Sequence, residues 1–262
     1  MDTGVLAEYV PELRAGRGGR IGLLALFGLA AASAVLILID TLWPAWSGAG
    51  QVAAILLAFP WVVQFFWRRK AYLARWGDMA YRNAFARHML PGMPLIFAAI
   101  AHNAYLPGVR VATGWTQAAL FAAGLYFFSI GLVLWARAAS IFGLDNLSML
   151  YVYYPEKSRL VKSSIYALIR HPVYAGVVRV GLALGLWRGT WFSIAFGLFM
   201  PIGLTLWLRL AEERELLERF GERYADYRRS VPAFWPRFQN AGKFANFLLF
   251  GEGDERSRNE VY

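Results

Sequence analysis

The fold is decided by residues 170–213, which read RHPVYAGVVRVGLALGLWRGTWFSIAFGLFMPIGLTLWLRLAEE. Two apolar segments in this stretch, Pro172–Trp187 and Thr190–Leu208, are separated only by Arg188-Gly189. A helix of about 20 apolar residues crosses the hydrocarbon core of a bilayer, and so short a connection makes neighbouring helices run antiparallel. The stretch therefore predicts a transmembrane helical hairpin whose last residues return to the side of the membrane where Arg170 lies.

Four further stretches without acidic or basic residues precede this hairpin. Apolar residues make up 58% of the chain, which is more than a soluble domain of this size can bury. We therefore expect an all-α, multi-pass membrane bundle of about six spans. An amphipathic helix should follow over Arg209–Val231, where apolar residues recur every three or four positions. The four preceding stretches are Ile21–Ile39, Gln51–Trp67, Met89–Val109 and Trp115–Ala136.

Basic residues are unevenly distributed over the two sides of such a bundle. If six spans alternate in direction, all but three of the 27 Lys and Arg residues fall on the side that carries both termini. The exceptions are Arg110, Arg188 and the mid-span Arg179. Because positive residues favour the cytoplasm, we expect both termini to be cytoplasmic. In so apolar a chain, the net charge of +10 indicates contact with anionic lipid headgroups rather than with nucleic acid.

The pattern divides the chain into three parts. Residues 1–137 hold four spans, residues 138–237 hold a long cytoplasmic loop, the hairpin and the amphipathic helix, and residues 238–262 form a tail. We expect the polar end of this tail, Gly251–Tyr262, to be frayed. The chain has no Cys and only three His, too few for a multi-histidine di-iron site, so no metal is expected.

The beginning of the hairpin carries groups that suit an anionic ligand. Pro172 tolerates the first turn of a helix and pushes the residue before it out of helical geometry. We therefore expect Pro172 to open the helix, with His171 near the N-cap and Arg170 just outside. A cation and free N–H groups at the positive end of a helix bind carboxylate or phosphate. The alternative is a proline-started helix whose Arg170 extends to lipid headgroups.

The other end of the hairpin carries two carboxylates. Glu212 and Glu213 follow the membrane boundary by only a few residues, where a carboxylate is costly to desolvate unless it meets a positive partner. The hairpin brings them near Arg170. A cationic helix terminus beside a pair of carboxylates matches a zwitterion, and S-adenosylmethionine is such a ligand. The alternative for this segment is a solvated helix with Glu–Arg pairs.

These motifs resemble the membrane methyltransferase family that includes isoprenylcysteine carboxyl methyltransferase, with phospholipid N-methyltransferases as relatives. The order and spacing of the motifs carry this resemblance, which spans roughly residues 140–237. At two positions the chain departs from the family: Ser164-Ile165 replaces a Gly-containing pair, and Leu208 stands where prenylcysteine enzymes carry Arg. The matching elements are Leu160–Tyr166, Arg170–Gly176, Glu212-Glu213, Phe220–Tyr227 and Val231–Pro236.

The resemblance implies methyl transfer from S-adenosylmethionine, held at the cytoplasmic face, to a lipophilic acceptor that enters from the bilayer. Positioning and exclusion of water should dominate catalysis, and Glu213 or His171 would remove the proton of an amine or hydroxyl acceptor. Glu213, Arg170 and Arg179 are the catalytic candidates. The residues that the resemblance assigns to cofactor binding are Tyr166, Arg170, His171, Pro172, Tyr174, Gly176, Glu212 and Glu213.

Two polar positions within spans have competing interpretations. Arg179 is expected to face the bundle interior and to hold an acidic substrate headgroup. Alternatively, it is structural and pairs with Asp40 or with backbone carbonyls. His102 and Asn103 are expected to be a hydrogen-bonded packing pair rather than a ligand site.

Two other functional classes remain open from the sequence. One is an NADPH-dependent membrane reductase of the sterol or isoprenoid type, which shares a related C-terminal architecture. The other is a non-catalytic membrane protein or transporter on the same scaffold. For a methyltransferase, the acceptors compatible with the sequence are prenylated cysteine, phosphatidylethanolamine, a small thiol and a quinone- or isoprenoid-like lipid.

Overall fold

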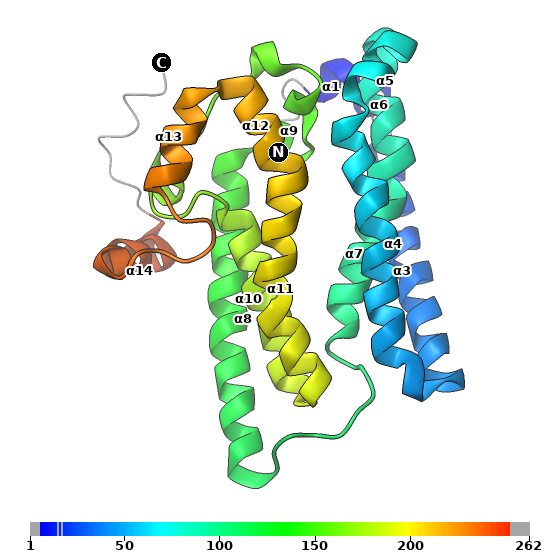
Figure 1. Cartoon of the computed structure of the whole chain (residues 1–262), viewed down its shortest axis with the longest axis vertical. Coiled ribbons are helices and arrows are strands. Elements are labelled where there is room, and N and C mark those ends of the chain that lie inside the picture. The colour runs from blue at the N-terminus through cyan, green and yellow to red at the C-terminus, as the bar shows by residue number, and fades with distance from the viewer. Residues whose placement is uncertain (1–5, 15, 17, 252–262) are drawn as a thin grey trace.

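The computed structural model describes residues 6–14, 16 and 18–251, and the regular structure of this part of the chain is helical (Figure 1). Five helical segments in it are long and apolar enough to cross a membrane, which confirms the all-α membrane bundle. Apart from Gly251, the predicted frayed end lies outside the described residues. The five segments are Gly18–Leu42, Pro44–Trp67, Arg69–His102, Gly114–Phe142 and Trp191–Phe220.

The predicted span Pro172–Trp187 is a shorter, buried helix. It is α10 (Pro172–Arg188), which has 17 residues and therefore a length of about 26 Å at 1.5 Å per residue. Pro172 starts it, and Gly189 ends it with a positive φ of 68°. Most of its residues are buried because α8 (Gly114–Phe142) and α11 (Trp191–Trp207) pack on it. The predicted hairpin of α10 and α11 is present, but α10 is not a full-length apolar span.

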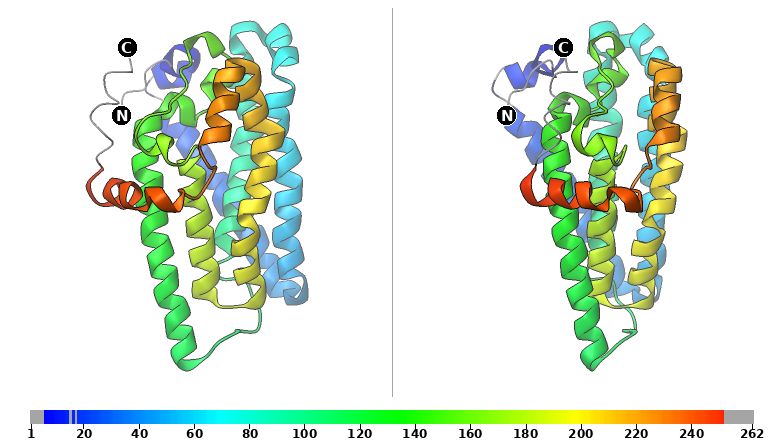
Figure 2. Two further views of the ribbon diagram at one scale, coloured as in Figure 1. Left: turned by 60° about the vertical axis from the view of Figure 1, so that its left-hand side comes forward. Right: turned by 90° about the vertical axis from the view of Figure 1, so that its left-hand side faces the viewer.

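The membrane helices form two groups of three (Figures 1 and 2). The first group is α3 (Gly18–Leu42), α4 (Ser47–Trp67) and α7 (Leu90–His102), and the second is α8, α10 and α11. Hydrogen bonds join the groups at both ends of the bundle. At one end the Asn103 amide donates to the carbonyls of Gly181 (3.1 Å) and Ser193 (3.0 Å). At the other end the Trp67 indole donates to the carbonyl of Leu210 (2.7 Å).

The two polar residues at the end of α7 are structural, as the sequence predicted. Both His102 and Asn103 are buried. The imidazole of His102 lies 2.8 Å from the carboxylate of Asp40 in α3, and Asn103 makes the two bonds between the helix groups. Asp40 is thus paired with His102, whereas the hydrogen bonds of Arg179 go to backbone carbonyls instead of to Asp40.

Helices α8 and α10 pack closely because glycines face each other. A Cβ added to Gly176 would lie 2.8 Å from the carbonyl oxygen of Gly131, and one added to Gly131 would lie 2.9 Å from that of Gly176. Neither contact is possible for a real side chain without movement of a helix. Small residues at such contacts allow close packing in membranes, where burial gives little driving force between helices.

The predicted amphipathic helix after the hairpin is interrupted twice. Helix α11 passes through a π-helical turn, Leu208–Glu212, into α12 (Glu213–Phe220). The chain then turns at Gly221, which has a φ of 56° that favours glycine, and continues as α13 (Glu222–Ser230). The sequence prediction of one continuous helix was therefore wrong. No structure was predicted from the sequence for residues 238–250 of the tail, which contain α14 (Ala241–Phe250), a helix that lies across the bundle (Figure 2).

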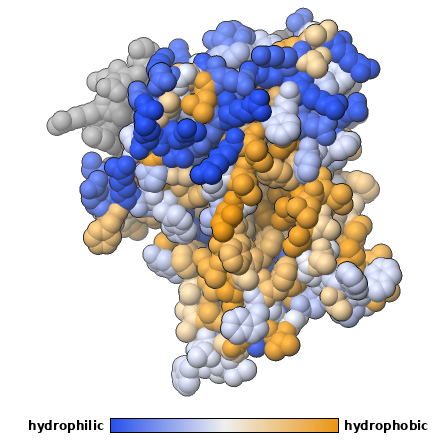
Figure 3. All heavy atoms as spheres, in the orientation of Figure 1, coloured by the Kyte–Doolittle hydropathy of each residue, from blue (hydrophilic) through white to orange (hydrophobic). Residues whose placement is uncertain are grey.

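The remaining short elements cover the bundle at the end where α12 and α13 lie (Figure 1). In the predicted loop, Tyr153 donates to the carbonyl of Phe65 in α4 (2.9 Å), and Tyr154 stacks on Tyr9 with 3.7 Å between ring centroids. Figure 3 shows hydrophilic residues over this end and hydrophobic residues over the helix shafts below it. The further elements are α1 (Leu6–Tyr9), α2 (Pro11–Arg14), α5 (Arg69–Trp76), α6 (Ala80–Ala84) and α9 (Leu144–Leu147).

Ser164 adopts a left-handed conformation, with a φ of 55°, at one of the positions where the sequence departs from its family pattern. A non-glycine residue in this region costs about 1–2 kcal/mol, partly offset by the larger chain entropy that glycine loses on folding. We expect Ser164→Gly to raise the free energy of unfolding by about 0.5–1 kcal/mol. Thermal unfolding in detergent would measure this change. Ser163→Gly is the matched control, because Ser163 has an extended backbone with a φ of −90° and should lose stability; a gain of the same size in both variants would contradict the argument.

Candidate active site

The residues before α10 lie where the sequence predicted them. Helix α10 begins at Pro172, His171 is its N-cap residue, and Arg170 lies just outside. The backbone N–H groups of Arg170 and His171 do not face a ligand, however. They donate to the carbonyls of Pro232 (2.9 Å) and Ala233 (3.1 Å). The Val231–Pro236 motif therefore runs beside the start of α10, and we call this segment the strap.

The two ends of the hairpin meet in an ionic cluster around Glu213. The guanidinium Nε of Arg170 donates to Glu213 Oε1 at 2.8 Å, and His171 Nε2 lies 3.1 Å from the same oxygen. Arg228 of α13 approaches Glu213 Oε2 at 3.7 Å. Glu213 and His171 are buried, and a buried carboxylate persists only when it is paired and hydrogen-bonded. The predicted convergence of the Arg170–His171 end with the carboxylate end is therefore present.

Glu212 completes the cluster on the side of α10. Its Oε2 accepts a hydrogen bond from the Tyr174 hydroxyl (2.7 Å), which in turn accepts one from the Trp207 indole (3.1 Å). Its Oε1 lies 3.5 Å from His171 Nδ1, so the imidazole lies between the two carboxylates. The π-helical turn ends at Glu212 and α12 begins at Glu213, so the pair lies where these two elements meet. π turns of this kind are frequent at functional sites.

The cluster favours the protonated form of His171. Burial opposes protonation, but the hydrogen bonds and charges of Glu212 and Glu213 outweigh it, so that the pKa of His171 is raised above its ordinary value of 6.5. A group whose pKa is higher in the folded than in the unfolded protein stabilises the fold when it is protonated. This stabilisation is complete at pH values below the pKa of the unfolded state, and it is lost as the pH rises through the pKa of the folded state.

We therefore expect the difference in melting temperature between the wild type and His171→Gln to be largest below pH 6.5 and to shrink as the pH rises above it. Thermal unfolding of both proteins in detergent over a pH series would measure this difference. Glu222→Gln, at an exposed position of α13, should differ from the wild type by the same small amount at every pH. A difference for His171→Gln that grows with pH would contradict the assigned direction.

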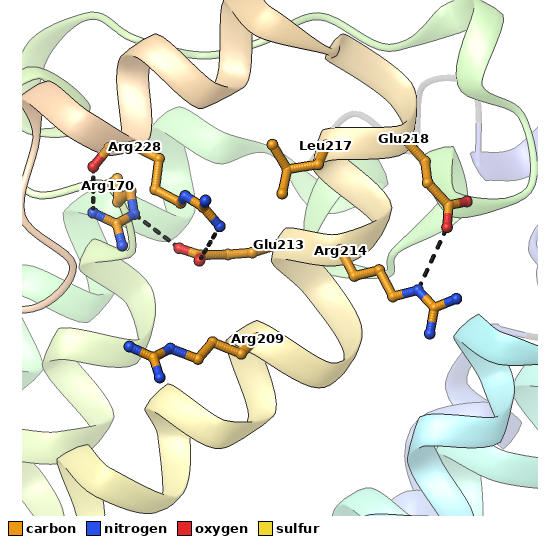
Figure 4. Close-up of a pocket in the computed structure, with 7 residues that line it drawn as sticks. All are labelled: Arg170, Arg209, Glu213, Arg214, Leu217, Glu218 and Arg228. Carbon is orange, nitrogen blue, oxygen red and sulfur yellow. Dashed lines mark hydrogen bonds and ion pairs between the residues drawn. The ribbon is translucent and has the colours of Figure 1, made fainter.

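An open cleft of about 810 Å³ lies beside this cluster (Figure 4). Sites for small molecules commonly have volumes of 300–1,000 Å³. Arg209 belongs to the π turn, and its guanidinium makes no ion pair with the other residues drawn in Figure 4. Arg214 is held loosely by Glu218 at 3.6 Å. The cleft therefore offers cationic groups to an anion beside the paired carboxylate of Glu213. Its lining residues are Arg170, Arg209, Glu213, Arg214, Leu217, Glu218 and Arg228.

Three residues that the sequence assigned to the site lie elsewhere. The Tyr166 hydroxyl donates to the carbonyl of Ala138 in α8 (3.2 Å), and its ring stacks on Phe142. Gly176 allows α8 to approach α10 rather than a ligand to approach the backbone. Arg179 is buried, donates to the carbonyls of Ala175 (2.8 Å) and Phe234 (3.3 Å), and places its guanidinium 4.1 Å from the Trp235 ring centroid.

Arg179 thus follows the structural alternative, with carbonyl partners in place of Asp40. Its guanidinium lies under the strap and is not part of the cleft lining. The strap accepts hydrogen bonds from both Arg170 and Arg179, so this segment connects Arg179 with the cluster. Our proposal for the binding site therefore leaves out Tyr166, Gly176 and Arg179.

Several residues of the cleft and of the cluster beside it were not predicted from the sequence. Arg228 was part of the predicted amphipathic helix, but only the turn at Gly221 directs α13 back toward Glu213. Tyr224 of α13 places its hydroxyl 3.5 Å from His171 Nε2, and burial raises its pKa. The signal that was available is the match of Phe220–Tyr227 to the family pattern, which identified the segment but not its partners. Arg209 and Arg214 carried no signal beyond their proximity to the Glu pair.

The structure is thus an all-helical membrane bundle with an ionic cluster and a cleft at one end, and comparisons with known proteins indicate the class to which it is similar. Residues 119–223 match the model of the phospholipid methyltransferase family. Over 102 residues the chain is 31% identical to the methanethiol S-methyltransferase of Crocosphaera subtropica. These residues cover 36% of this chain and 38% of that protein, so the chain spans less than half the length of this relative. No solved structure shows a significant match.

The matched residues include most of α8 and all of α10, α11 and α12. They contain every residue of the ionic cluster described above except Arg228 and Tyr224 of α13. The resemblance to membrane methyltransferases is therefore confirmed for this part of the chain, and the matches support an enzyme of this class. Enzymes of these families generally use S-adenosylmethionine. The residues at the cleft fit its amino acid group, since arginines suit a carboxylate and the carboxylates of the Glu pair suit an ammonium group.

Proposed function

We propose that the chain is an S-adenosylmethionine-dependent membrane methyltransferase whose site is the cleft between α10, α12 and α13. The observation that carries this proposal is the convergence of Arg170 and His171 with Glu212 and Glu213 beside the cleft. It joins two sequence blocks separated by the hairpin. The family match and the similarity to a methanethiol S-methyltransferase support the same class of reaction.

The residues of the cleft would divide the work of binding. When bound, S-adenosylmethionine supplies an electrophilic methyl carbon on a sulfonium. Arg209 and Arg214 would hold its carboxylate, and Glu213 would attract its positive groups. Arg170, His171 and Tyr174 keep the two carboxylates in place. Methyl transfer then depends mainly on alignment and on exclusion of water.

The charges of the cleft favour an acceptor that reacts as an anion. Both oxygens of Glu213 lie near cationic groups, which stabilises its ionised form and makes it a weak proton acceptor. A thiol beside arginines ionises readily, and a thiolate or carboxylate needs no base. We therefore favour a lipophilic or small thiol, or a carboxylate such as that of a prenylated cysteine, over a phosphatidylethanolamine amine. The relative named as a methanethiol S-methyltransferase supports the thiol.

The bilayer is the proposed route of a lipophilic acceptor. Figure 3 shows a hollow with hydrophobic walls between α11 and the first helix group, below the hydrophilic end. Leu198, Ile202, Leu206 and Leu210 repeat every four residues along α11 and its π turn, and all are exposed. The last of them adjoins Arg209. The positive-inside distribution of charge supports a cytoplasmic position for the cleft.

Ligand binding separates this function from its alternatives. We expect S-adenosylhomocysteine to raise the melting temperature of the purified protein, and NADPH to leave it unchanged. Membranes incubated with methyl-labelled S-adenosylmethionine should transfer label to an alkyl thiol or an isoprenoid carboxylate in preference to phosphatidylethanolamine. Stabilisation by NADPH alone would favour a reductase, and stabilisation by neither ligand would favour a protein without this activity.

A further inference from the structure

Helix α14 is fixed on the outside of the bundle. Figure 2 shows that it lies across the other helices rather than along them. Phe247 is buried against the bundle, with Phe244 and Leu248 half-buried beside it. Arg137 of α8 donates hydrogen bonds to the carbonyls of Phe247 and Leu249. A guanidinium at this place caps the last turn of a helix, so α14 has a defined position on α8.

The rest of α14 and the 3₁₀ turn before it, Phe238–Asn240, have two exposed faces of different character. Apolar residues recur at intervals of three and four along one face, where Phe238 is 96% and Leu249 is 68% exposed. We call this face the apolar stripe, and it comprises Phe238, Ala241, Ala245 and Leu249. The second face carries the exposed polar residues Gln239, Lys243 and Asn246, with the exposed Phe250 at its C-terminal end. A helix with adjoining apolar and polar exposed faces is typical of a membrane surface.

The level of α14 agrees with such a surface. It meets α8 at Arg137, directly after the exposed apolar residues Leu132 and Trp135. Tryptophan is enriched where the hydrocarbon core ends. In the common orientation of Figures 1 and 3, α14 lies near the boundary between the hydrophobic shafts and the hydrophilic end. The exposed apolar residues of α8 therefore end just before the point where α14 meets this helix.

We propose that α14 binds the bilayer surface through the apolar stripe. We propose further that this binding holds the strap in place and thereby keeps Arg170 and His171 in position at the site. The strap leads from α13 to α14, and its carbonyls accept the backbone hydrogen bonds of Arg170 and His171. Arg179 fastens its middle through the Phe234 carbonyl and the Trp235 ring. The docking itself is independent of the proposed function, whereas the importance of Arg170 and His171 for catalysis rests on it.

Single cysteines test the docking, because the chain has none of its own. The full chain is placed in nanodiscs of phosphatidylcholine and phosphatidylglycerol and carries a spin label at one position at a time. For labels at Ala245→Cys and Leu249→Cys, we expect strong collisional relaxation by oxygen, which concentrates in the bilayer. The same labels should be poorly accessible to a water-soluble nickel chelate. Labels at Lys243→Cys and Asn246→Cys should show the reverse. Equal exposure to the chelate at all four positions would overturn the proposal.

A pair of matched charges tests whether membrane binding of α14 holds Arg170 and His171 in position. Ala245→Asp and Asn246→Asp add the same charge to adjacent positions, the first on the apolar stripe and the second on the polar face. Hydrogen exchange of the Arg170 and His171 amides in nanodiscs should become about tenfold faster in Ala245→Asp, because their bonds to the strap open more often. In Asn246→Asp it should stay unchanged. Unchanged hydrogen exchange in both variants would overturn the proposal that membrane binding of α14 holds Arg170 and His171 in position. Neither measurement uses a cofactor, so a failure of the methyltransferase assignment is seen separately in the ligand-binding experiment.

Discussion

Glu213→Gln should abolish the stabilisation by S-adenosylhomocysteine and lower the free energy of unfolding by about 3–5 kcal/mol, the usual effect of removing one partner of a buried ion pair. The amide keeps the size of the side chain but not its charge. Arg170 and His171 then lose the carboxylate that lies within 3.1 Å of both. His171 can release its proton, whereas the guanidinium of Arg170 cannot.

Two measurements separate the parts of this effect. Unfolding in detergent gives the loss of stability, and the shift of melting temperature with S-adenosylhomocysteine gives the loss of binding. Glu222→Gln is the control for charge, since Glu222 is exposed and pairs only loosely with Arg229 at 3.6 Å. It should change neither quantity. Full ligand stabilisation in Glu213→Gln would show that the cluster only supports the fold.

The sequence was most informative where a local rule or a short connection decided the structure. Pro172 determines where α10 begins, because proline fixes φ and restricts the residue before it. The Arg188-Gly189 turn then places the far end of α11 near Arg170, whatever the detailed packing. These two features were enough to predict that Arg170 and His171 meet Glu212 and Glu213. The apolar stretches in turn predicted the membrane bundle.

Features that depend on contacts between distant segments were not predictable in this way. Arg228 reaches Glu213 only because Gly221 adopts a positive φ, and the motif that contains Gly221 also reads well as one continuous helix. The apolar residues of the tail are too few to indicate a membrane span. Helix α14 is held in its position by a contact with Arg137 of α8, which the sequence does not reveal. The sequence left two interpretations of Arg179 open, a substrate ligand and a structural residue, because sequence patterns do not reveal hydrogen bonds to backbone carbonyls such as those that Arg179 makes.

Gly176 has two possible roles, close packing of α8 on α10 or close approach of a ligand to the backbone, and a substitution distinguishes them. We expect Gly176→Ala to lower the free energy of unfolding by about 1–3 kcal/mol, the usual cost of overpacking. The new methyl group would lie 2.7 Å from Trp135 Cβ, 2.8 Å from the Gly131 carbonyl oxygen and 3.0 Å from the Trp135 nitrogen. Two of these atoms belong to the backbone of α8 and cannot rotate away. Thermal unfolding in detergent would measure the loss.

Gly203→Ala in α11 is the matched control, because no atom lies within 4 Å of the position of its Cβ. Here the same substitution removes a flexible residue from a helix and should raise the free energy of unfolding by about 0.5–1 kcal/mol. The two variants should therefore differ in sign although their chemistry is identical. If Gly176→Ala kept full stability and lost only the response to S-adenosylhomocysteine, Gly176 would contact the ligand. If it lost stability as expected, the ligand response would fall only because α10 shifts and moves Arg170 and His171 with it.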